Sequence, residues 1–165
     1  MKLRDVLDRP LTYSEVGATV GEMPAGYRHV SESAVIGRGR ARFDEAAAAG
    51  MRYGMLRGAG LRVDATSPVA EVGATVVVHL GPVPAPCRVV AVFDETDRRG
   101  FAYGTLAGHP ETGEELFAVR FDPVTEAVHA EVRAFSRHAT WWSRSAGPVT
   151  TLAQRLVTRR YLRAL

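Results

Sequence analysis

The sequence predicts an α+β domain in which a bent antiparallel β-sheet is wrapped around a long C-terminal helix. An alanine-rich segment without proline, residues 40–55, indicates an early helix. Beyond residue 60 the chain changes to short β-compatible runs that are separated by glycine, proline and acidic residues. The last segment, from Val149 to Ala164, carries apolar residues at helical spacing. A long sheet has one large apolar face to cover, and this terminal helix supplies a matching apolar stripe.

Seven runs are expected to form strands. They cover residues 27–37, 61–65, 74–80, 86–94, 100–106, 114–121 and 127–136. The loops between the later runs are short, which favours an antiparallel meander over parallel strands with crossover helices. Alternation places Glu115 on the same strand face as Phe117, whereas residues 87–93 are apolar on both faces apart from one arginine and predict a central strand.

The remaining segments complete the expected order. Residues 3–8 have the pattern of a short helical turn, and residues 11–27 hold enough glycine and proline to predict an ordered loop. The terminal helix begins at Gly147-Pro148 or continues from a longer helix that starts near Ala139. We expect a single domain over residues 1–165, on which residues 1–26 pack as an N-terminal extension, on either side of the sheet.

The composition restricts the classes of partner. The net charge is only +3 and the basic residues are spread along the chain, so no nucleic-acid interface is expected. Lys2 is the single lysine, and a GC-rich coding bias explains the abundant arginine better than a functional arginine surface does. The single cysteine, Cys87, excludes an intramolecular disulfide and disfavours a cysteine-based zinc site. No run resembles a signal peptide or is long enough to span a bilayer, so a cytoplasmic protein without stable membrane insertion is expected.

Seven segments carry a resemblance to a known family. They read LTYSEVGAT (11–19), PAGYRHV (24–30), GRGRARF (37–43), RGAGLRV (57–63), GFAYGTLAGHPETGEELF (100–117), FSRHATW (135–141) and RRYLRAL (159–165). Across nearly the whole chain the sequence resembles an uncharacterised bacterial and plant protein family, a domain of unknown function. That family is related to the START, polyketide-cyclase and birch-pollen-allergen domains. The resemblance implies their helix-grip fold, with a cavity for lipids, sterols or aromatic ligands between the sheet and the C-terminal helix, but it implies no catalytic residue.

The hairpin segment GFAYGTLAGHPETGEELF holds the main candidates for chemistry. His109 has the chemistry of a general base that Glu114 or Glu115 could orient, or it is a turn histidine that bonds locally. Because a strand alternates, only one of the two glutamates can face inward, and the apolar pattern favours Glu115. A carboxylate there would be buried and would need a partner such as an arginine or Tyr103.

Other candidates rest on position alone. The predicted ligand-binding residues are Arg57, Tyr103, His109, Glu115 and Trp141. Arg57 would be held beside the sheet by its RGAG segment, and Trp141 would either cover a cavity entrance or pack at the rim of the sheet. Gly37 and Gly39 match the start of a dinucleotide fingerprint but lack its third glycine, which favours a structural turn. The five histidines lack metal-ligand spacing, so neither a metal nor a cofactor is expected.

Three functions from different classes remain open. The first is a non-enzymatic module that binds a small hydrophobic or amphipathic molecule, which the predicted fold and the lack of a recognisable catalytic set favour. The second is an enzyme of cyclase, hydratase or lyase type that uses His109 or Glu115 as acid or base. The third is an interaction protein whose core is filled by its own side chains. The sequence leaves the ligand and the oligomeric state undetermined.

Overall fold

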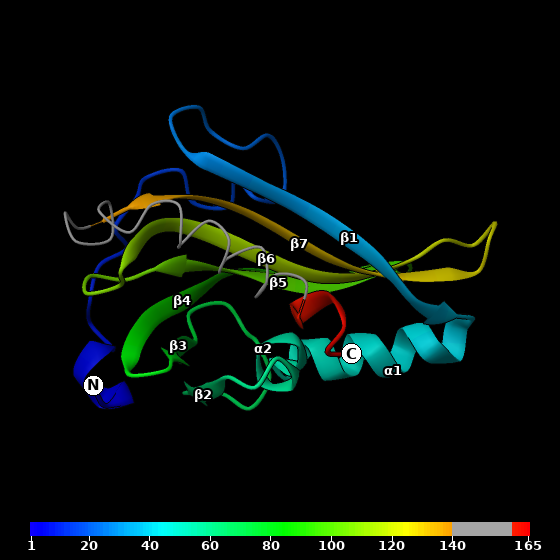
Figure 1. Cartoon of the computed structure of the whole chain (residues 1–165), viewed down its shortest axis with the longest axis horizontal. Helices are drawn as coiled ribbons and strands as arrows, with labels where there is room; N and C mark the ends of the chain where they lie inside the picture. Colours follow the sequence, from blue (N-terminus) through cyan, green and yellow to red (C-terminus); the bar gives the residue numbers. More distant parts are fainter. Residues whose placement is uncertain (140–159) are drawn as a thin grey trace.

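The protein is an α+β domain built on one bent antiparallel sheet, as predicted (Figure 1). The computed structural model describes residues 1–139 and 160–165. The sheet has seven strands in the order β1-β7-β6-β5-β4-β3-β2. The strands are β1 (Arg28–Arg38), β2 (Arg62–Ala65), β3 (Thr75–Leu80), β4 (Val83–Asp94), β5 (Arg98–Thr105), β6 (Glu111–Phe121) and β7 (Ala127–His138). From β2 to β7 each strand pairs with the next along the chain, which confirms the predicted meander, and β1 pairs with β7.

Helical segments lie before and after β1. They are the 3₁₀ turn η1 (Leu3–Val6), α1 (Arg40–Met51) and α2 (Gly54–Gly58). α1 begins after Gly39, whose backbone φ of 86° favours glycine, so the Gly37–Gly39 segment is a turn into a helix. The helix predicted over residues 40–55 is interrupted, because Tyr53 adopts a left-handed φ of 62° and turns the chain into α2. This turn lets Tyr53, Met55 and Leu56 all enter the core.

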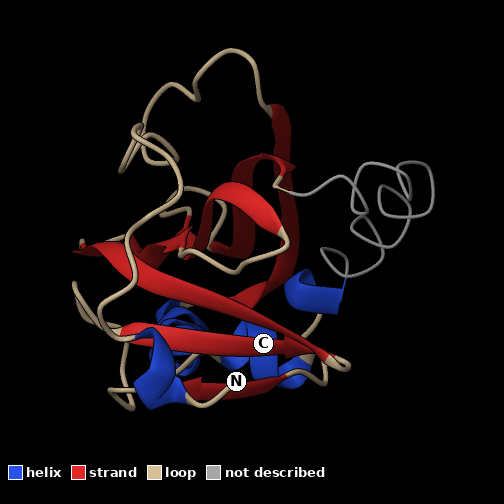
Figure 2. Cartoon of the chain, turned by 90° about the vertical axis from the view of Figure 1, so that its left-hand side faces the viewer, coloured by secondary structure: helices blue, strands red, loops and turns tan. Residues whose placement is uncertain are grey.

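The sheet has two different faces. We call the face that packs against α1, α2 and residues 160–165 the inner face; Figure 1 and Figure 2 show these helical segments on one side of the curved sheet. Its aromatic floor consists of Phe101 and Tyr103 on β5 and Phe117 on β6. Tyr161 covers this floor, with its ring centroid 5.4 Å from that of Phe117. Residues 160–162 are helical, and the rest of the predicted terminal helix lies outside the described residues.

The opposite face, the outer face, is covered by the N-terminal segment. Tyr13 and Tyr27 pack edge-on against Phe135 of β7, with ring centroids 5.6 and 5.0 Å from it. A methyl group at Gly104 of β5 would overlap the Tyr13 hydroxyl, so the missing side chain makes room for this segment. Residues 11–27 therefore lie on the side of the sheet away from α1 and α2.

β4 is a central strand, as the sequence predicts. It lies between β3 and β5. Cys87 and Val89 enter the main core on the inner face, whereas Val90 and Phe93 pack on a small outer cluster around Leu116. Among the residues that the structure describes, no helix combines the length and the apolar character needed to cross a bilayer.

Candidate functional site

The candidate site is a tyrosine–glutamate pair on the inner face of the sheet. Tyr103 of β5 and Glu115 of β6 are direct cross-strand partners, and their side chains point to the same side. The Tyr103 hydroxyl donates a hydrogen bond of 3.0 Å to Oε2 of Glu115. The ring centroid of Tyr103 lies 5.4 Å from that of Phe117 in an edge-on contact. Two polar groups are thereby paired within an aromatic floor.

Glu115 keeps partial solvent access in this apolar setting. Its side chain is half-buried, whereas its cross-strand partners Tyr103 and Ala134 are 6% and 7% exposed. Burial raises the pKa of the Glu115 carboxyl to about 7, and the charge of Glu111 acts in the same direction, while the hydrogen bond from Tyr103 opposes both. The carboxyl can therefore exchange a proton near neutral pH.

The negative charge of Glu115 acts on three further titratable groups. They are the Cys87 thiol on β4, the Tyr103 phenol and the Tyr161 phenol near the C-terminus. Burial, reinforced by the negative charge of Glu115, raises the pKa of each group well above its usual value. All three are therefore neutral at physiological pH, and Cys87 is a buried, unreactive thiol.

An ion pair lies next to the tyrosine–glutamate pair at the same end of the inner face. Arg28 of β1 contacts Oε1 of Glu111 through Nη2 at 2.9 Å, and the same nitrogen donates to Oγ of Ser136 at 3.1 Å. The Nε atom of Arg28 is buried and has no hydrogen-bond partner within residues 1–139 and 160–165. Arg28 therefore contacts Glu111 and Ser136, and it does not form an ion pair with Glu115.

His109 lies at the tip of the β5–β6 hairpin and is not paired with either glutamate. Its Nδ1 lies 2.9 Å from both the backbone N–H and the carbonyl oxygen of Glu111, so the ring bonds to the backbone of its own turn. Burial lowers the pKa of His109 to about 4. The ring borders a small open cavity of about 300 Å³ together with Thr12 and Pro84. This is the local turn histidine, one of the two alternatives that the sequence left open.

The remaining predicted residues lie elsewhere. Arg57 is exposed at the last turn of α2, where its charge acts on the hydroxyl of Tyr53. Its charge is not among the causes that shift the pKa of Glu115. Trp141 lies outside the described residues. The structure thus joins Tyr103 to Glu115 and leaves Arg57 and His109 apart from them.

Sequence reasoning missed the role of Glu114. Its side chain points to the outer face and is only 3% exposed. The carboxylate accepts hydrogen bonds from the Tyr13 hydroxyl at 2.6 Å, the Gly17 N–H at 2.7 Å and the Thr19 N–H at 3.0 Å. The Thr19 hydroxyl adds a fourth bond. A signal was available in the sequence, because a carboxylate on the opposite face of a strand that is covered on both sides needs donors, and the glycine-rich segment 11–27 can supply backbone N–H groups.

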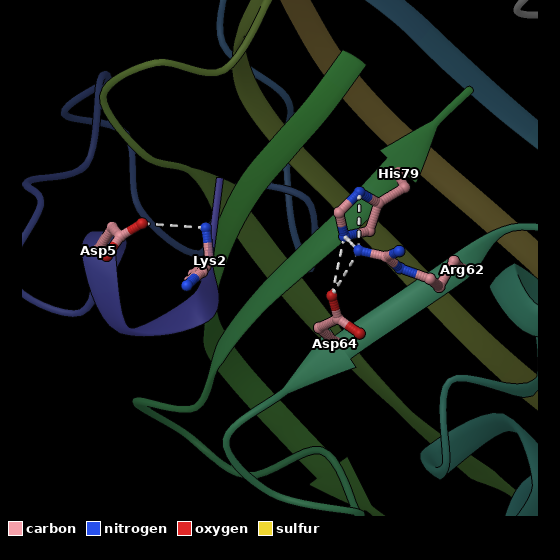
Figure 3. Close-up of polar contacts among 5 residues, drawn as sticks. All are labelled: Lys2, Asp5, Arg62, Asp64 and His79. Atoms are coloured by element: carbon pink, nitrogen blue, oxygen red, sulfur yellow. Dashed lines mark hydrogen bonds and ion pairs between the residues drawn. The ribbon is translucent and has the colours of Figure 1, made fainter. Parts of the chain in front are cut away.

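A second missed feature is a charged cluster on β2 and β3 (Figure 3). The cross-strand partners Arg62 and His79 meet Asp64, whose Oδ2 lies 2.9 Å from Nε2 of His79 and 3.1 Å from Nη2 of Arg62. The hydrogen bond with His79 is the main cause that lowers the pKa of Asp64. The described residues contain no group of three histidine, cysteine or acidic side chains that could hold a metal ion. Only the strand register, which a single sequence does not reveal, brings these residues together.

The chain matches a known protein family over most of its length. The family model described as a domain of unknown function, DUF1990, matches residues 12–164. The chain belongs to the DUF1990 family. A UPF0548 protein from Deinococcus radiodurans is 36% identical over 169 aligned residues, which cover 93% of this chain and 85% of that protein. The resemblance expected from the seven sequence segments is therefore confirmed at the level of the family.

Two solved structures share the fold at low sequence identity. A hypothetical protein from Helicobacter pylori is similar with a TM-score of 0.66 and 7% identity, covering 82% of this chain and 83% of that one. A protein from Nitrosospira multiformis is similar with a TM-score of 0.56 and 11% identity, covering 82% of this chain and 94% of that one. These likenesses show that the arrangement of sheet and helices recurs in proteins of unrelated sequence.

Proposed function

We propose that this protein binds a small hydrophobic or amphipathic molecule on the inner face of the sheet, with the polar end of the molecule at Tyr103 and Glu115. One observation carries the proposal: a half-buried carboxyl, with a single hydrogen bond among the residues that the structure describes, lies among buried aromatic side chains. A carboxyl in such a place destabilises the fold unless something compensates its burial. A bound molecule with a matching polar group would supply that compensation.

The surroundings of the pair support an apolar ligand body. Phe101, Phe117 and Tyr161 form a continuous set of edge-on and tilted ring contacts beside Tyr103. Aromatic walls with a small number of polar groups are typical of sites for small molecules, because the walls supply affinity and the polar groups fix orientation. His109 and Arg57 have no part in this proposal, since both lie away from the pair.

The first test is native mass spectrometry of the gently purified full chain, followed by denaturing extraction of any molecule that it carries. We expect a defined extra mass that is lost on unfolding. In parallel, the full chain is titrated with the uncharged dye Nile red, which reports an apolar site by its fluorescence. A bare polypeptide mass together with no dye binding would reject the proposal.

Two alanines of β7 provide a matched pair of variants for this test. Ala134 is the inner-face partner of Glu115, and Ala127 lies on the outer face of the same strand; each is 7% exposed. Ala134→Leu adds bulk beside Glu115 and is expected to weaken dye binding about tenfold or more, which corresponds to about 1.4 kcal/mol. Ala127→Leu adds the same bulk elsewhere and is expected to leave dye binding unchanged. Equal effects of the two variants would place the dye outside the proposed site.

A second candidate function is acid–base catalysis by Glu115. The observation that favours it is the pKa of about 7, which is suited to proton transfer at neutral pH. Incubation of the extracted molecule with the protein in D₂O tests it by mass spectrometry. Deuterium uptake into carbon positions with the wild type, and its loss with Glu115→Gln, would support an enzyme. If the wild type causes no deuterium uptake, catalysis is rejected and ligand binding is the remaining function.

A further inference from the structure

We propose that the inner-face site selects molecules whose polar end is a neutral or cationic hydrogen-bond donor, such as an alcohol or amine, and discriminates against carboxylates. The inference deepens the binding function proposed above and rests on it. It is argued from the hydrogen-bonding capacity and the charges of the side chains that surround Glu115.

Hydrogen-bond donors and acceptors are not balanced at the Tyr103–Glu115 pair. Tyr103 uses its one hydroxyl proton on Oε2 of Glu115. Within residues 1–139 and 160–165, this is the only hydrogen bond that the Glu115 side chain makes. An ionised carboxylate has about four acceptor positions and no proton to donate. The pair therefore offers unused acceptors to a ligand, and an alcohol or ammonium group can supply the donor.

The charges around Glu115 also disfavour a bound carboxylate. Glu115 and Glu111 are both acidic residues of β6, and the charge of Glu111 already raises the pKa of Glu115. Arg28 is committed to Glu111 and Ser136 through Nη2. The other titratable groups that respond to Glu115 are neutral phenols and a neutral thiol. A carboxylate placed against Glu115 would meet a like charge in an apolar environment, where such a pair is unfavourable.

Arg28 is the one described residue near the site that an anion could use instead. A carboxylate at Arg28 would lie beside the like charge of Glu111, because Nη2 of Arg28 already contacts both Glu111 and Ser136. The class of ligand that binds therefore distinguishes Glu115 from Arg28 as the residue that contacts its polar end. Selection of an amine or alcohol points to Glu115, and selection of a carboxylate points to Arg28.

The test is displacement of Nile red from the full chain by dodecylamine, dodecanol and dodecanoate at pH 8, each below its micelle-forming concentration. The three probes share one apolar tail, so differences report the polar end. We expect the amine and the alcohol to displace the dye at concentrations about tenfold lower than dodecanoate, a difference of about 1.4 kcal/mol. Glu115→Gln should weaken the amine and strengthen dodecanoate, so that the preference disappears.

The control variant is Glu22→Gln, which removes the same charge from an exposed position in the N-terminal segment. It should leave the order of the three probes unchanged. If dodecanoate displaces the dye best, and Arg28→Gln abolishes that preference, the inference is wrong while the binding function stands. If the dye and all three probes fail to bind, the binding function itself is wrong. An unchanged probe order in Glu115→Gln would also overturn the inference.

Discussion

Two neighbouring glutamates of β6 show how one residue type serves two purposes. Glu114 on the outer face accepts four hydrogen bonds, two of them from backbone N–H groups of the N-terminal segment. Glu115 on the inner face has one hydrogen bond in the described part of the chain, from Tyr103. Each has a tyrosine partner, and the two side chains diverge because successive residues of a strand point to opposite faces.

The difference lies in how completely the carboxylate is satisfied. A buried carboxylate with several donors holds a segment in place, because every donor would be left unpaired without it. A half-buried carboxylate with one donor keeps acceptors free at a cost in stability. The first arrangement is expected to contribute to folding and the second to binding.

The largest effect is expected for Glu114→Gln. The amide has only one acceptor oxygen, so the N–H groups of Gly17 and Thr19 and the Tyr13 hydroxyl cannot all be satisfied. We expect a loss of about 4 kcal/mol in the free energy of unfolding, since each unpaired buried donor costs about 1–3 kcal/mol. Urea unfolding at pH 7 measures it, with Glu22→Gln as the control. A loss below about 1 kcal/mol would mean that the outer-face network contributes little.

The next effect is a pH-dependent gain in stability for Glu115→Gln. The pKa of Glu115 is raised in the folded state from 4.5 to about 7. Its contribution to stability is therefore fully present below pH 4.5 and is lost as the pH rises through 7. Because glutamine does not titrate, the variant should become more stable than the wild type across this window, by on the order of 2–3 kcal/mol above pH 7 after allowance for partial exposure.

His109→Asn gives the opposite pattern and serves as a control for the sign. Burial lowers the pKa of His109 from 6.5 to about 4, so this contribution to stability is present above pH 6.5 and is lost as the pH falls through 4. The asparagine variant should gain on the wild type toward acid pH, whereas Glu115→Gln gains toward neutral pH. Unfolding curves at pH 4.5 and 8 separate the two, and gains in the same direction would contradict both assignments.

A smaller effect is expected for Gly104→Ala. The new methyl group would overlap the hydroxyl of Tyr13 and push this ring away from Glu114. Overpacking of this kind costs about 2 kcal/mol. Gly21→Ala is the control, because a methyl group there meets nothing within 4 Å. In a double-mutant cycle with Tyr13→Phe the two losses should not add, and full additivity would show that Tyr13 is not what restricts the site.

The smallest effects come from removing single tyrosine hydroxyls. Tyr13→Phe and Tyr103→Phe each remove a bond to a glutamate and should cost about 1–2 kcal/mol. Tyr53→Phe should be neutral or slightly stabilising, because the buried Tyr53 hydroxyl has no hydrogen-bond partner among the residues described. Thermal unfolding of the three variants gives this order. A loss in Tyr53→Phe as large as that in Tyr13→Phe would show that the glutamates do not set the difference.

The sequence by itself determined the local pattern of this protein. Alternation along β6 was enough to place Glu114 and Glu115 on opposite faces and to make Tyr103 a plausible partner of Glu115. The strands from β2 to β7 and the start of α1 after Gly39 were also predictable, because strand and helix periods and the conformational freedom of glycine are properties of the backbone.

Only the tertiary structure decided which distant segments meet. The pairing of β1 with β7 and the attachment of residues 11–27 to Glu114 join residues that are far apart in the sequence, and the strand register of β2 and β3 brings Asp64 to His79. The break at Tyr53 has the same origin, since core packing holds that residue in a conformation that its own preferences disfavour. Such contacts depend on the packing of the whole domain, whereas a periodic pattern depends on neighbouring residues alone.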